Sequence, residues 1–446
     1  MSKVDPSMFK AYDVRGIYPD QLNEEVAYRI GRAYSEFIKP KTVMVGRDIR
    51  LSSKSLSEAL NRGLTEQGVN VVDAGQIGTD MVYFGVAHYR YDGGIMITAS
   101  HNPKEYNGMK FVREQSIPIS GDTGIMEIRD IVISGEFTPS DKVGQVEEQD
   151  IYQDYTGHVL SFIDPKVIKP YKVVLNGGNG VAGDIISQII EHLPIQSIPI
   201  YFEPDGTFPR GEPNPLLPKN RTETIEKVKE EKADLGVAWD GDADRCFFID
   251  EKGNFIEGYF ITALLAETLL KKHPGEKIIF DPRLTWANIE VVKENRGIPI
   301  INKSGHAFFK ERMRQENALF AGEMSAHFYF RENYFADNGI IPFLLILELM
   351  STSGKSLSDL LKPLMSKYFI SGEINRRVED GAAKLKEIEG RYQDGKVEHI
   401  DGLSVEFPDW RFNLRVSNTE PLIRLNVEAR SRKIMEEKRD ELLEML

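Results

Sequence analysis

The chain has 446 residues, of which 69 are acidic and 56 basic, and its net charge at neutral pH is −13. This length exceeds what one hydrophobic core usually organises, so roughly three or four domains are expected. The acidic balance argues against nonspecific nucleic-acid binding, and the single cysteine, Cys246, excludes an intrachain disulfide. The longest apolar run, Ile340–Met350, is too short to cross a membrane and is expected to be a core helix. We therefore expect a cytoplasmic protein that binds neither nucleic acid nor membrane.

Short apolar strands alternate with helical segments, a pattern that predicts α/β domains with parallel strands. Three similar units each contain an opening strand and a later one, namely Thr42–Gly46 with Gly94–Thr98, Tyr171–Leu175 with Asp234–Ala238, and Lys277–Asp281 with Ala318–Ala321. Residues 134–150 are predicted to be a linker, and the proline-rich segment 204–220 a surface loop.

The pattern changes near residues 366–375. Beyond that point it predicts strands at 404–407, 411–416 and 422–428 and an amphipathic helix at 432–446. We therefore predict three similar α/β domains with mixed sheets, at residues 1–147, 148–252 and 253–368. A smaller α+β domain is predicted at residues 369–446.

Polar motifs follow the later strand of each of the three units. They are Ser100-His-Asn-Pro103, Asp240-Gly-Asp-Ala-Asp-Arg245 and Glu323-Met-Ser-Ala-His327. Ligand sites of open α/β sheets lie outside the carboxyl ends of the strands. Three related domains that each present one such loop could therefore border a single cleft.

The Asp240–Arg245 motif places three carboxylates on alternating positions, which repel one another unless a hard divalent cation lies between them. A solvated acidic turn is the ordinary alternative. A calcium loop is rejected, because its sixth position requires glycine and holds Arg245 here. Residues 246–249 also read as a buried strand.

Ser100 lies where a strand ends, but the glycines of a hydrolase nucleophile elbow are absent. His101 is its neighbour, and neighbours on an extended backbone point to opposite faces. A serine near a magnesium loop suggests phosphoryl chemistry instead, because the cation and Arg245 would offset the charge of a phosphoserine.

Two further motifs are suited to a sugar phosphate. If residues 322–327 are extended, Glu323, Ser325 and His327 share one face and could bind neighbouring sugar hydroxyls. The segment Arg415–Pro421 groups a guanidinium with hydroxyl and amide donors suited to phosphate. A half-exposed strand and an ordinary polar turn, respectively, are the competing interpretations.

Together these motifs resemble the α-D-phosphohexomutase family, within it the bacterial phosphomannomutase/phosphoglucomutase group. The resemblance covers essentially the whole chain and includes Tyr12-Asp-Val-Arg-Gly16. It implies four domains around a central cleft and an enzyme that moves a phosphoryl group between O1 and O6 of a hexose. A hexose phosphate would be the substrate, and hexose 1,6-bisphosphate the intermediate and activator. The sequence leaves the oligomeric state open.

The resemblance also assigns roles to individual residues. Ser100 would carry the phosphoryl group, and Mg²⁺ would be held by Asp240, Asp242, Asp244 and an oxygen on Ser100. The other catalytic candidates are His101, Lys110, Arg245, Arg15 and His306, with Arg245 expected to steady the serine loop. The substrate-binding candidates are Tyr12, Arg283, Gly305, Glu323, Ser325, His327, Arg415, Ser417, Asn418 and Thr419.

The sequence departs from the family pattern at Ala243 and Ala326, where glycine is frequent, and at Arg283, where some relatives have lysine. Mannose phosphate is the first choice of substrate, with glucose phosphate as a second one. A phosphoglucosamine mutase, a magnesium-dependent sugar phosphatase and a non-catalytic sugar-phosphate-binding protein are the competing functions.

Overall fold

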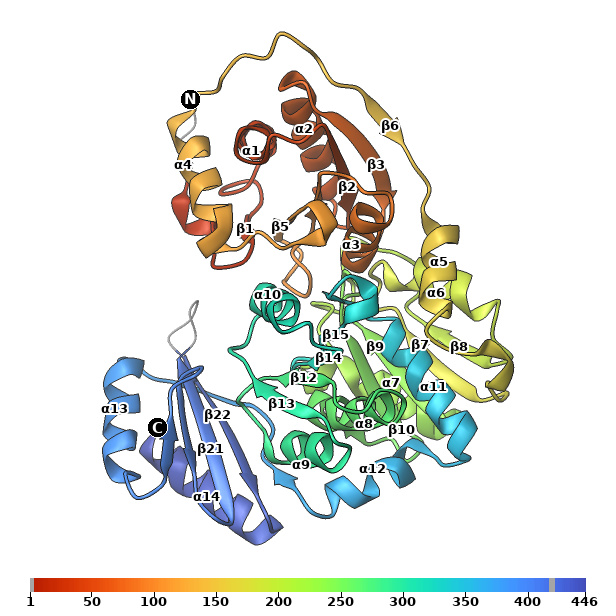
Figure 1. The fold of residues 1–446 in the computed structure, drawn as a ribbon, viewed down its shortest axis with the longest axis vertical. Helices are drawn as coiled ribbons and strands as arrows, with labels where there is room; N and C mark the ends of the chain where they lie inside the picture. Colours follow the sequence, from red (N-terminus) through yellow and green to blue (C-terminus); the bar gives the residue numbers. More distant parts are fainter. Residues whose placement is uncertain (1–3, 417–421) are drawn as a thin grey trace. The chain divides into compact units, whose positions relative to one another are not determined.

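The computed structural model describes residues 4–416 and 422–446. The chain divides into two compact units, and Figure 1 labels their helices and strands. The first comprises Met1–Phe255 and Tyr329–Gly354, and the second Ile256–Phe328 and Lys355–Leu446. Within the described ranges, no helix has the length and apolar character needed to cross a membrane.

The first unit begins with a six-stranded mixed sheet in the order β1-β5-β4-β2-β3-β6. Its strands are β1 (Val14–Ile17), β2 (Thr42–Arg47), β3 (Asn70–Gln76), β4 (Gly93–Ile97), β5 (Tyr106–Arg113) and β6 (Val146–Glu148). The strands β2, β3, β4 and β6 are parallel, whereas β5 pairs antiparallel with both β4 and β1. The carboxyl ends of β2, β3 and β4 therefore lie at the same edge of the sheet.

Helices cover both faces of this sheet. They are α1 (Glu24–Ile38), α2 (Ser53–Glu66), α3 (Thr79–His88) and α4 (Met126–Ser134). Val43 and Val45 of β2 share a core with α1, α2 and α4. The residue between them, Met44, points to the other face, where its sulfur approaches Gly85 of α3. The alternation along β2 thus produces a sheet that is buried on both sides.

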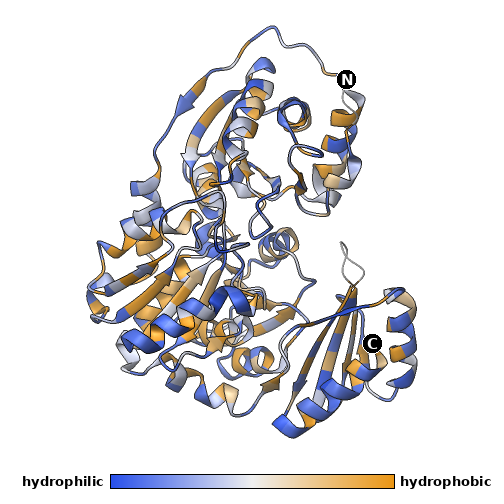
Figure 2. Cartoon of the chain, turned by 180° about the vertical axis from the view of Figure 1, so that it is seen from behind, coloured by the Kyte–Doolittle hydropathy of each residue, from blue (hydrophilic) through white to orange (hydrophobic). Residues whose placement is uncertain are grey.

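A second sheet in the first unit contains β10 (Cys246–Asp250), β9 (Leu235–Trp239), β7 (Lys172–Asn176) and β8 (Gln196–Ile200), in that order. Its central strands are strongly apolar (Figure 2). Every residue of β9 and β10 is buried. The remaining helices of this unit are α5 (Tyr152–Leu160), α6 (Ala182–Ile190), α7 (Pro218–Glu231) and α11 (Ile341–Ser353). The short strands β15 (Phe328–Phe330) and β16 (Ala336–Asp337) pair antiparallel through Tyr329 and Phe330, and β11 spans Phe255–Ile256.

The second unit contains the parallel strands β12 (Lys277–Phe280), β13 (Ile298–Ile301) and β14 (Phe320–Gly322), with β12 between the other two. Its helices in this part are α8 (Gly258–Lys272), α9 (Trp286–Glu294), α10 (His306–Glu316) and α12 (Leu357–Met365). The apolar side chains of α8 are buried almost throughout, which identifies it as a core helix.

The C-terminal part of the second unit is an antiparallel sheet in the order β17-β22-β21-β20-β19, with β18 also paired to β22. Its elements are β17 (Phe369–Ile370), β18 (Ile374–Arg377), α13 (Gly381–Arg391), β19 (Lys396–Glu398), β20 (Leu403–Glu406), β21 (Trp410–Val416), β22 (Leu422–Ala429) and α14 (Arg432–Met445). The helix α14 is largely hydrophilic in Figure 2 and buries Met435 and Leu442 against the sheet.

The predicted fold class, three α/β domains followed by a smaller α+β domain, is confirmed. Each strand predicted in the three units and the C-terminal part is present within a few residues, and Ile340–Met350 falls in the buried helix α11. The predicted linker was partly wrong, because Val146–Glu148 adds an edge strand to the first sheet. The proline-rich loop ends at Leu217, since Pro218 occupies the first turn of α7, where its missing N–H costs nothing.

Candidate active site

Ser100 lies in a sharp loop after β4, at the edge where the parallel strands end. Its φ angle is +49°, a left-handed conformation that L-residues with a side chain rarely adopt. Its N–H donates to Thr98 Oγ1 at 2.8 Å, and its own Oγ lies 2.9 Å from Asp240 Oδ2 and 3.0 Å from His101 Nδ1. The extended backbone assumed for Ser100 and His101 was therefore wrong. The left-handed turn brings these neighbouring side chains together.

The serine loop is held by Arg50, a residue that the sequence analysis missed. Its guanidinium donates to four backbone carbonyls, those of Ser100 at 2.8 Å, Asn102 at 2.7 Å, Pro103 at 2.7 Å and Tyr106 at 3.0 Å. Asp48 accepts from the Arg50 Nε at 3.1 Å and fixes the guanidinium. Burial lowers the pKa of Arg50, and the Asp48 carboxylate opposes that shift. Arg50 thus holds the backbone of this loop in the structure, and the expectation that Arg245 also steadies the loop stays a prediction.

The three aspartates of the metal motif converge as expected. One carboxylate oxygen from each of Asp240, Asp242 and Asp244 lies within 4.8 Å of the others, and all three residues are buried. Burial, followed by the charges of Asp244 and Asp242, raises the pKa of Asp240 to about 8. Three buried carboxylates at this spacing leave a strong negative potential that a hard cation would relieve.

Lys110 partly compensates this negative charge. Its Nζ, on β5, lies 2.7 Å from Asp242 Oδ2 and 2.6 Å from Asp244 Oδ2. Burial opposes the charged form of Lys110, but the Asp242 and Asp244 carboxylates outweigh it and raise the Lys110 pKa well above its ordinary value. Asp242 Oδ1 has no hydrogen-bond partner among residues 4–416 and 422–446. A buried carboxylate oxygen without a hydrogen-bond partner, within an all-oxygen donor set, fits a magnesium-like ion.

Two arginines complete this part of the site. Arg245 lies 3.4 Å from Asp240 Oδ2 through its Nε, and its backbone N–H donates to Asp240 Oδ1 at 3.3 Å. Arg15, on β1, donates to Asn102 Oδ1 at 2.7 Å and pairs with Asp13 at 2.6 Å. Tyr12, just before β1, is half-buried. The structure thus brings the predicted residues Arg15, Ser100, His101, Lys110 and Arg245 to the same metal-loop region of the first unit.

The alanines that replace family glycines both adopt left-handed backbone conformations. The φ angle is +61° at Ala243, in the metal loop, and +67° at Ala326, in the loop after β14. Each costs roughly 1–2 kcal/mol relative to a relaxed residue. The backbone of the metal loop therefore keeps a conformation that glycine would favour, although its side chain is alanine.

In the second unit, the loop after β14 is a turn, so the predicted extended strand at residues 322–327 was wrong. The Ala326 N–H donates to Glu323 O at 3.0 Å and the Glu323 N–H to His327 O at 2.9 Å. This turn still gathers the predicted side chains. His327 Nδ1 lies 3.3 Å from both Glu323 Oε2 and Ser325 Oγ.

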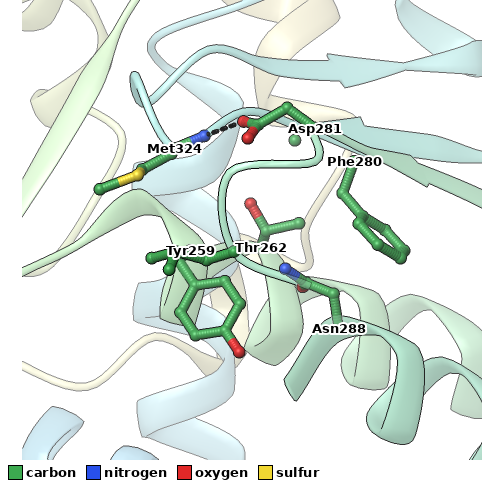
Figure 3. A pocket seen from close by; sticks show the side chains of 8 residues that line it. Tyr259, Thr262, Phe280, Asp281, Asn288 and Met324 are labelled. Atoms are coloured by element: carbon green, nitrogen blue, oxygen red, sulfur yellow. Dashed lines mark hydrogen bonds between the residues drawn. The ribbon is translucent and has the colours of Figure 1, made fainter. Parts of the chain in front are cut away.

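Asp281, another residue that the sequence analysis passed over, organises the same loop. Its carboxylate accepts from Arg283 Nε at 2.9 Å, from Arg283 NH2 at 2.8 Å and from the Met324 N–H at 2.7 Å. Figure 3 shows this last contact above side chains of α8 and α9 such as Tyr259 and Asn288. These side chains pack so closely that they leave a cavity of about 0 Å³, whereas ligand pockets usually measure about 300–1,000 Å³. They therefore support the loop after β14 and do not form a substrate pocket.

Gly305 and His306 lie at the start of α10. The Gly305 N–H donates to Glu323 Oε1 at 3.0 Å, and His306 Nδ1 lies 3.3 Å from Lys310 Nζ. The ring of His306 lies 6.4 Å from that of His327. The predicted residues Gly305, His306, Glu323, Ser325 and His327 are therefore neighbours in the second unit.

The predicted phosphate clamp begins at Arg415, at the end of β21. Its guanidinium donates to Asp401 Oδ2 at 3.2 Å and lies 3.9 Å from Glu373. Glu373 also lies 3.6 Å from Arg424 and 3.5 Å from Arg283. Three arginines thus converge on one glutamate. The other clamp candidates, Ser417, Asn418 and Thr419, lie outside the described residues.

The comparisons with known proteins agree with this arrangement. Four consecutive segments match the domains of the family described as phosphoglucomutase/phosphomannomutase. Residues 6–139, 151–253 and 257–368 match its alpha/beta/alpha domains I, II and III, and residues 373–445 match its C-terminal domain. The chain belongs to the phosphoglucomutase/phosphomannomutase family. It is therefore an enzyme, an isomerase that moves a phosphoryl group.

Several relatives in this family are similar along nearly their whole length. A protein of Xanthomonas campestris named as phosphohexose mutases is 51% identical over 95% of both chains. A phosphomannomutase of Salmonella montevideo is 50% identical over 98% of both chains. The crystal structure of a phosphoglucomutase/phosphomannomutase family protein from Burkholderia thailandensis superposes with a TM-score of 0.90 at 33% identity, over 99% of this chain and 97% of the other.

Proposed function

We propose that this enzyme is a phosphomannomutase that interconverts mannose 1-phosphate and mannose 6-phosphate through a phosphorylated Ser100. The observation that carries the proposal is the position of Ser100 Oγ, 2.9 Å from Asp240 Oδ2 beside a cluster of three carboxylates. Two relatives that are 50% and 47% identical over 98% of this chain are named phosphomannomutase, which supports mannose as the first choice of sugar.

The proposed reaction has two phosphoryl transfers. In the first, the free hydroxyl of the sugar phosphate attacks phosphorus on Ser100, so the bond from phosphorus to Oγ breaks as the bond to the sugar oxygen forms. The hydroxyl proton passes to a nearby base. The resulting hexose 1,6-bisphosphate turns over, and Ser100 Oγ takes the other phosphoryl group while the released sugar oxygen gains a proton. Free hexose 1,6-bisphosphate would act as the activator by phosphorylating Ser100 anew.

The residues of the first unit are assigned to this transfer. His101 Nδ1, at 3.0 Å from Ser100 Oγ, is placed to exchange a proton with it. Burial opposes the charged form of Lys110, but Asp242 and Asp244 outweigh it and raise the Lys110 pKa. Lys110 would therefore keep its proton and supply positive charge beside the transferred group, and it stays a candidate for proton transfer. Arg15 and Arg245 would stabilise negative charge, because arginine keeps its proton. Mg²⁺ would be held by Asp240, Asp242 and Asp244 with an oxygen on Ser100, and it would neutralise charge on the transferred group.

The residues of the second unit are assigned to recognition of the sugar phosphate. Glu323 and Ser325 would bind ring hydroxyls, with His327 and Gly305 as neighbours that fix the Glu323 carboxylate. Arg283, together with Tyr12 of the first unit, is a further candidate for contacts with the substrate. His306 is a further candidate for proton transfer. Arg415, together with Ser417, Asn418 and Thr419, would bind the phosphate that is not being transferred. We also propose domain boundaries after residues 147, 252 and 368.

A second candidate is a dual enzyme that also accepts glucose phosphate. The relative from Xanthomonas is named as phosphohexose mutases without one sugar, and the family description names both activities. Contacts with the ring at O3 and O4 would discriminate little at C2, where mannose and glucose differ.

The test is a coupled assay on the 1-phosphates of mannose, glucose and glucosamine with a hexose 1,6-bisphosphate activator. We expect turnover of mannose 1-phosphate, and intact mass spectrometry should find one phosphoryl group on Ser100. Preference for glucosamine 1-phosphate would make the enzyme a phosphoglucosamine mutase. Free phosphate as the main product would make it a phosphatase and refute the proposal.

A further inference from the structure

A buried threonine outside the sequence motifs contacts the metal loop. Thr79 is the first residue of α3 and has no exposed surface. Its hydroxyl donates to Asp242 Oδ2 at 2.5 Å, and its backbone N–H donates to the Asp242 carbonyl at 3.0 Å. One residue thus binds both the side chain and the main chain of the central aspartate of the cluster, 163 positions further along the chain.

These contacts make the two oxygens of the Asp242 carboxylate different from each other. Oδ2 accepts from the Thr79 hydroxyl and from Lys110 Nζ at 2.7 Å. Oδ1 has no hydrogen-bond partner in the part of the chain that the structure describes. The hydroxyl therefore sets the rotation of the carboxylate so that one oxygen is held and the other remains available for a cation.

The position of Thr79 is itself fixed by packing. A Cβ at the preceding residue, Gly78, would approach Asp80 Oδ1 to 2.7 Å and Ile185 Cδ1 to 2.9 Å. Asp80, the next residue of α3, accepts from the Tyr155 hydroxyl at 2.5 Å, and Asn338 donates to the same hydroxyl at 3.0 Å. The first turn of α3 is thus tied to α5 and to the segment after β16, which leaves the Thr79 hydroxyl little freedom to follow a moving carboxylate.

We propose that Thr79 is a positioning residue for the divalent cation, and that its hydroxyl sets the affinity of the site by orienting Asp242. The proposal rests on the metal assignment of the proposed function. Hydrogen-bond partners of metal ligands orient them, and their removal commonly weakens metal binding by about 10- to 100-fold. Thr79 would not touch the substrate or the reacting atoms.

The test compares Thr79→Val, which keeps the shape but removes the hydroxyl, with Thr79→Ser, which keeps the hydroxyl. Binding of Mn²⁺ to the full-length protein without substrate is measured by electron paramagnetic resonance, and the melting temperature is recorded without metal. Thr79→Val should bind Mn²⁺ at least about tenfold more weakly, and Thr79→Ser should stay close to the wild type.

A matched control is Thr224→Val, because Thr224 is equally buried and its hydroxyl accepts a hydrogen bond from the Asn176 side chain at 2.8 Å. This variant should bind Mn²⁺ as the wild type does. If Thr79→Val also retains wild-type affinity, or if Thr79→Ser is weakened as much as Thr79→Val, the positioning role is refuted. If the wild type binds no Mn²⁺, or if added Mg²⁺ does not displace the bound Mn²⁺, the metal assignment itself fails. That result is obtained with the wild type alone, before any variant is compared.

Discussion

Two regions of the molecule handle charge in opposite ways. In the first unit, Asp240, Asp242 and Asp244 form a buried cluster of carboxylates, and Lys110 supplies a cation within 2.7 Å of two of them. In the second unit, Arg283, Arg415 and Arg424 converge on a single carboxylate, that of Glu373, at 3.5–3.9 Å. One region is suited to receive a cation and the other an anion.

In both regions the protein supplies counterions from its own chain. Like charges buried together destabilise a fold unless they are compensated, so Lys110 and Glu373 stabilise the protein before a ligand arrives. Ligand binding is then an exchange, in which a metal ion or a phosphate replaces or adds to a side chain. The affinity of each region should therefore depend on these internal counterions as well as on the ligating residues.

The largest effect is expected for Ser100→Ala, which separates chemistry from recognition. The Ser100 hydroxyl contacts Asp240 and His101, so its loss should leave the second unit intact. We expect kcat to fall by at least about 10³-fold, because the loss of a covalent carrier removes the reaction path itself. Steady-state assays and intact mass measure the outcome.

Binding of the sugar phosphate by this variant, measured by calorimetry, should stay within a few-fold of the wild type. Ser187→Ala is a suitable control, since the Ser187 hydroxyl donates within α6, to the Gly183 carbonyl at 2.7 Å. Wild-type turnover by Ser100→Ala would refute the carrier role.

The residues with local sequence signals were found from the sequence. Alternating aspartates followed by an apolar strand, and a serine directly after a strand, predict their positions at the edge of a sheet, and the structure places Ser100 against Asp240. Arg50 and Thr79 carry no comparable signal. Their partners lie 50 and 163 residues away, and a lone arginine or threonine is common on any surface.

The turn at Glu323 shows a second limit of sequence reasoning. Alternating polar and apolar residues predict a strand. Ala326 nevertheless adopts a left-handed φ of +67°, which the presence of an alanine in the sequence does not predict. Backbone strain that tertiary contacts impose is not visible in the residue pattern. The same holds for Ser100, which has a left-handed conformation and whose carbonyl accepts from the distant Arg50.

Arg50 provides the next test of the first region. In Arg50→Lys the positive charge remains, but a lysine cannot reproduce the planar set of donors that binds four carbonyls. We expect kcat to fall by about 10²-fold, since a displacement of about 1 Å at the reacting atom can have that effect. KM should change little, and phosphorylation of Ser100 by the bisphosphate should slow in parallel.

Arg47→Lys is the matched control for this substitution, because Arg47 is half-exposed and pairs with Asp73 at 3.2 Å. A wild-type kcat for Arg50→Lys would show that the loop holds its conformation without the guanidinium.

A smaller effect is expected from pH on the cation site. Burial, with the charges of Asp244 and Asp242, raises the pKa of Asp240 from an ordinary 3.8 to about 8. The cation requires the ionised form, so the apparent affinity for Mg²⁺ should rise by up to about tenfold per pH unit below pH 8 and level off above it. Calorimetry in buffers of different ionisation enthalpy should detect proton release near neutral pH.

The raised pKa of Asp240 also makes the stability of the folded protein depend on pH. The folded state holds the Asp240 proton more tightly than the unfolded state, so the metal-free protein should lose stability as pH rises from about 4 to about 8. Added Mg²⁺ should reduce that loss, and Asp240→Asn should remove the part due to this group. A melting temperature of the metal-free protein that rises across this range would contradict the shift.

The smallest effect should come from removing the internal counterion of the second region. Glu373→Gln withdraws a negative charge from Arg283, Arg415 and Arg424, so phosphate should bind more tightly. We expect KM for both the 1- and 6-phosphates to fall about two- to fivefold, with a weaker effect at high salt, as for partly exposed charges. Arg415→Ala should act in the opposite direction on both isomers, and the exposed Glu379→Gln should leave both unchanged. A rise in KM for Glu373→Gln would instead show that the glutamate aligns the arginines for phosphate. Exchange of an internal counterion for a ligand would then describe the metal loop but not the arginine cluster.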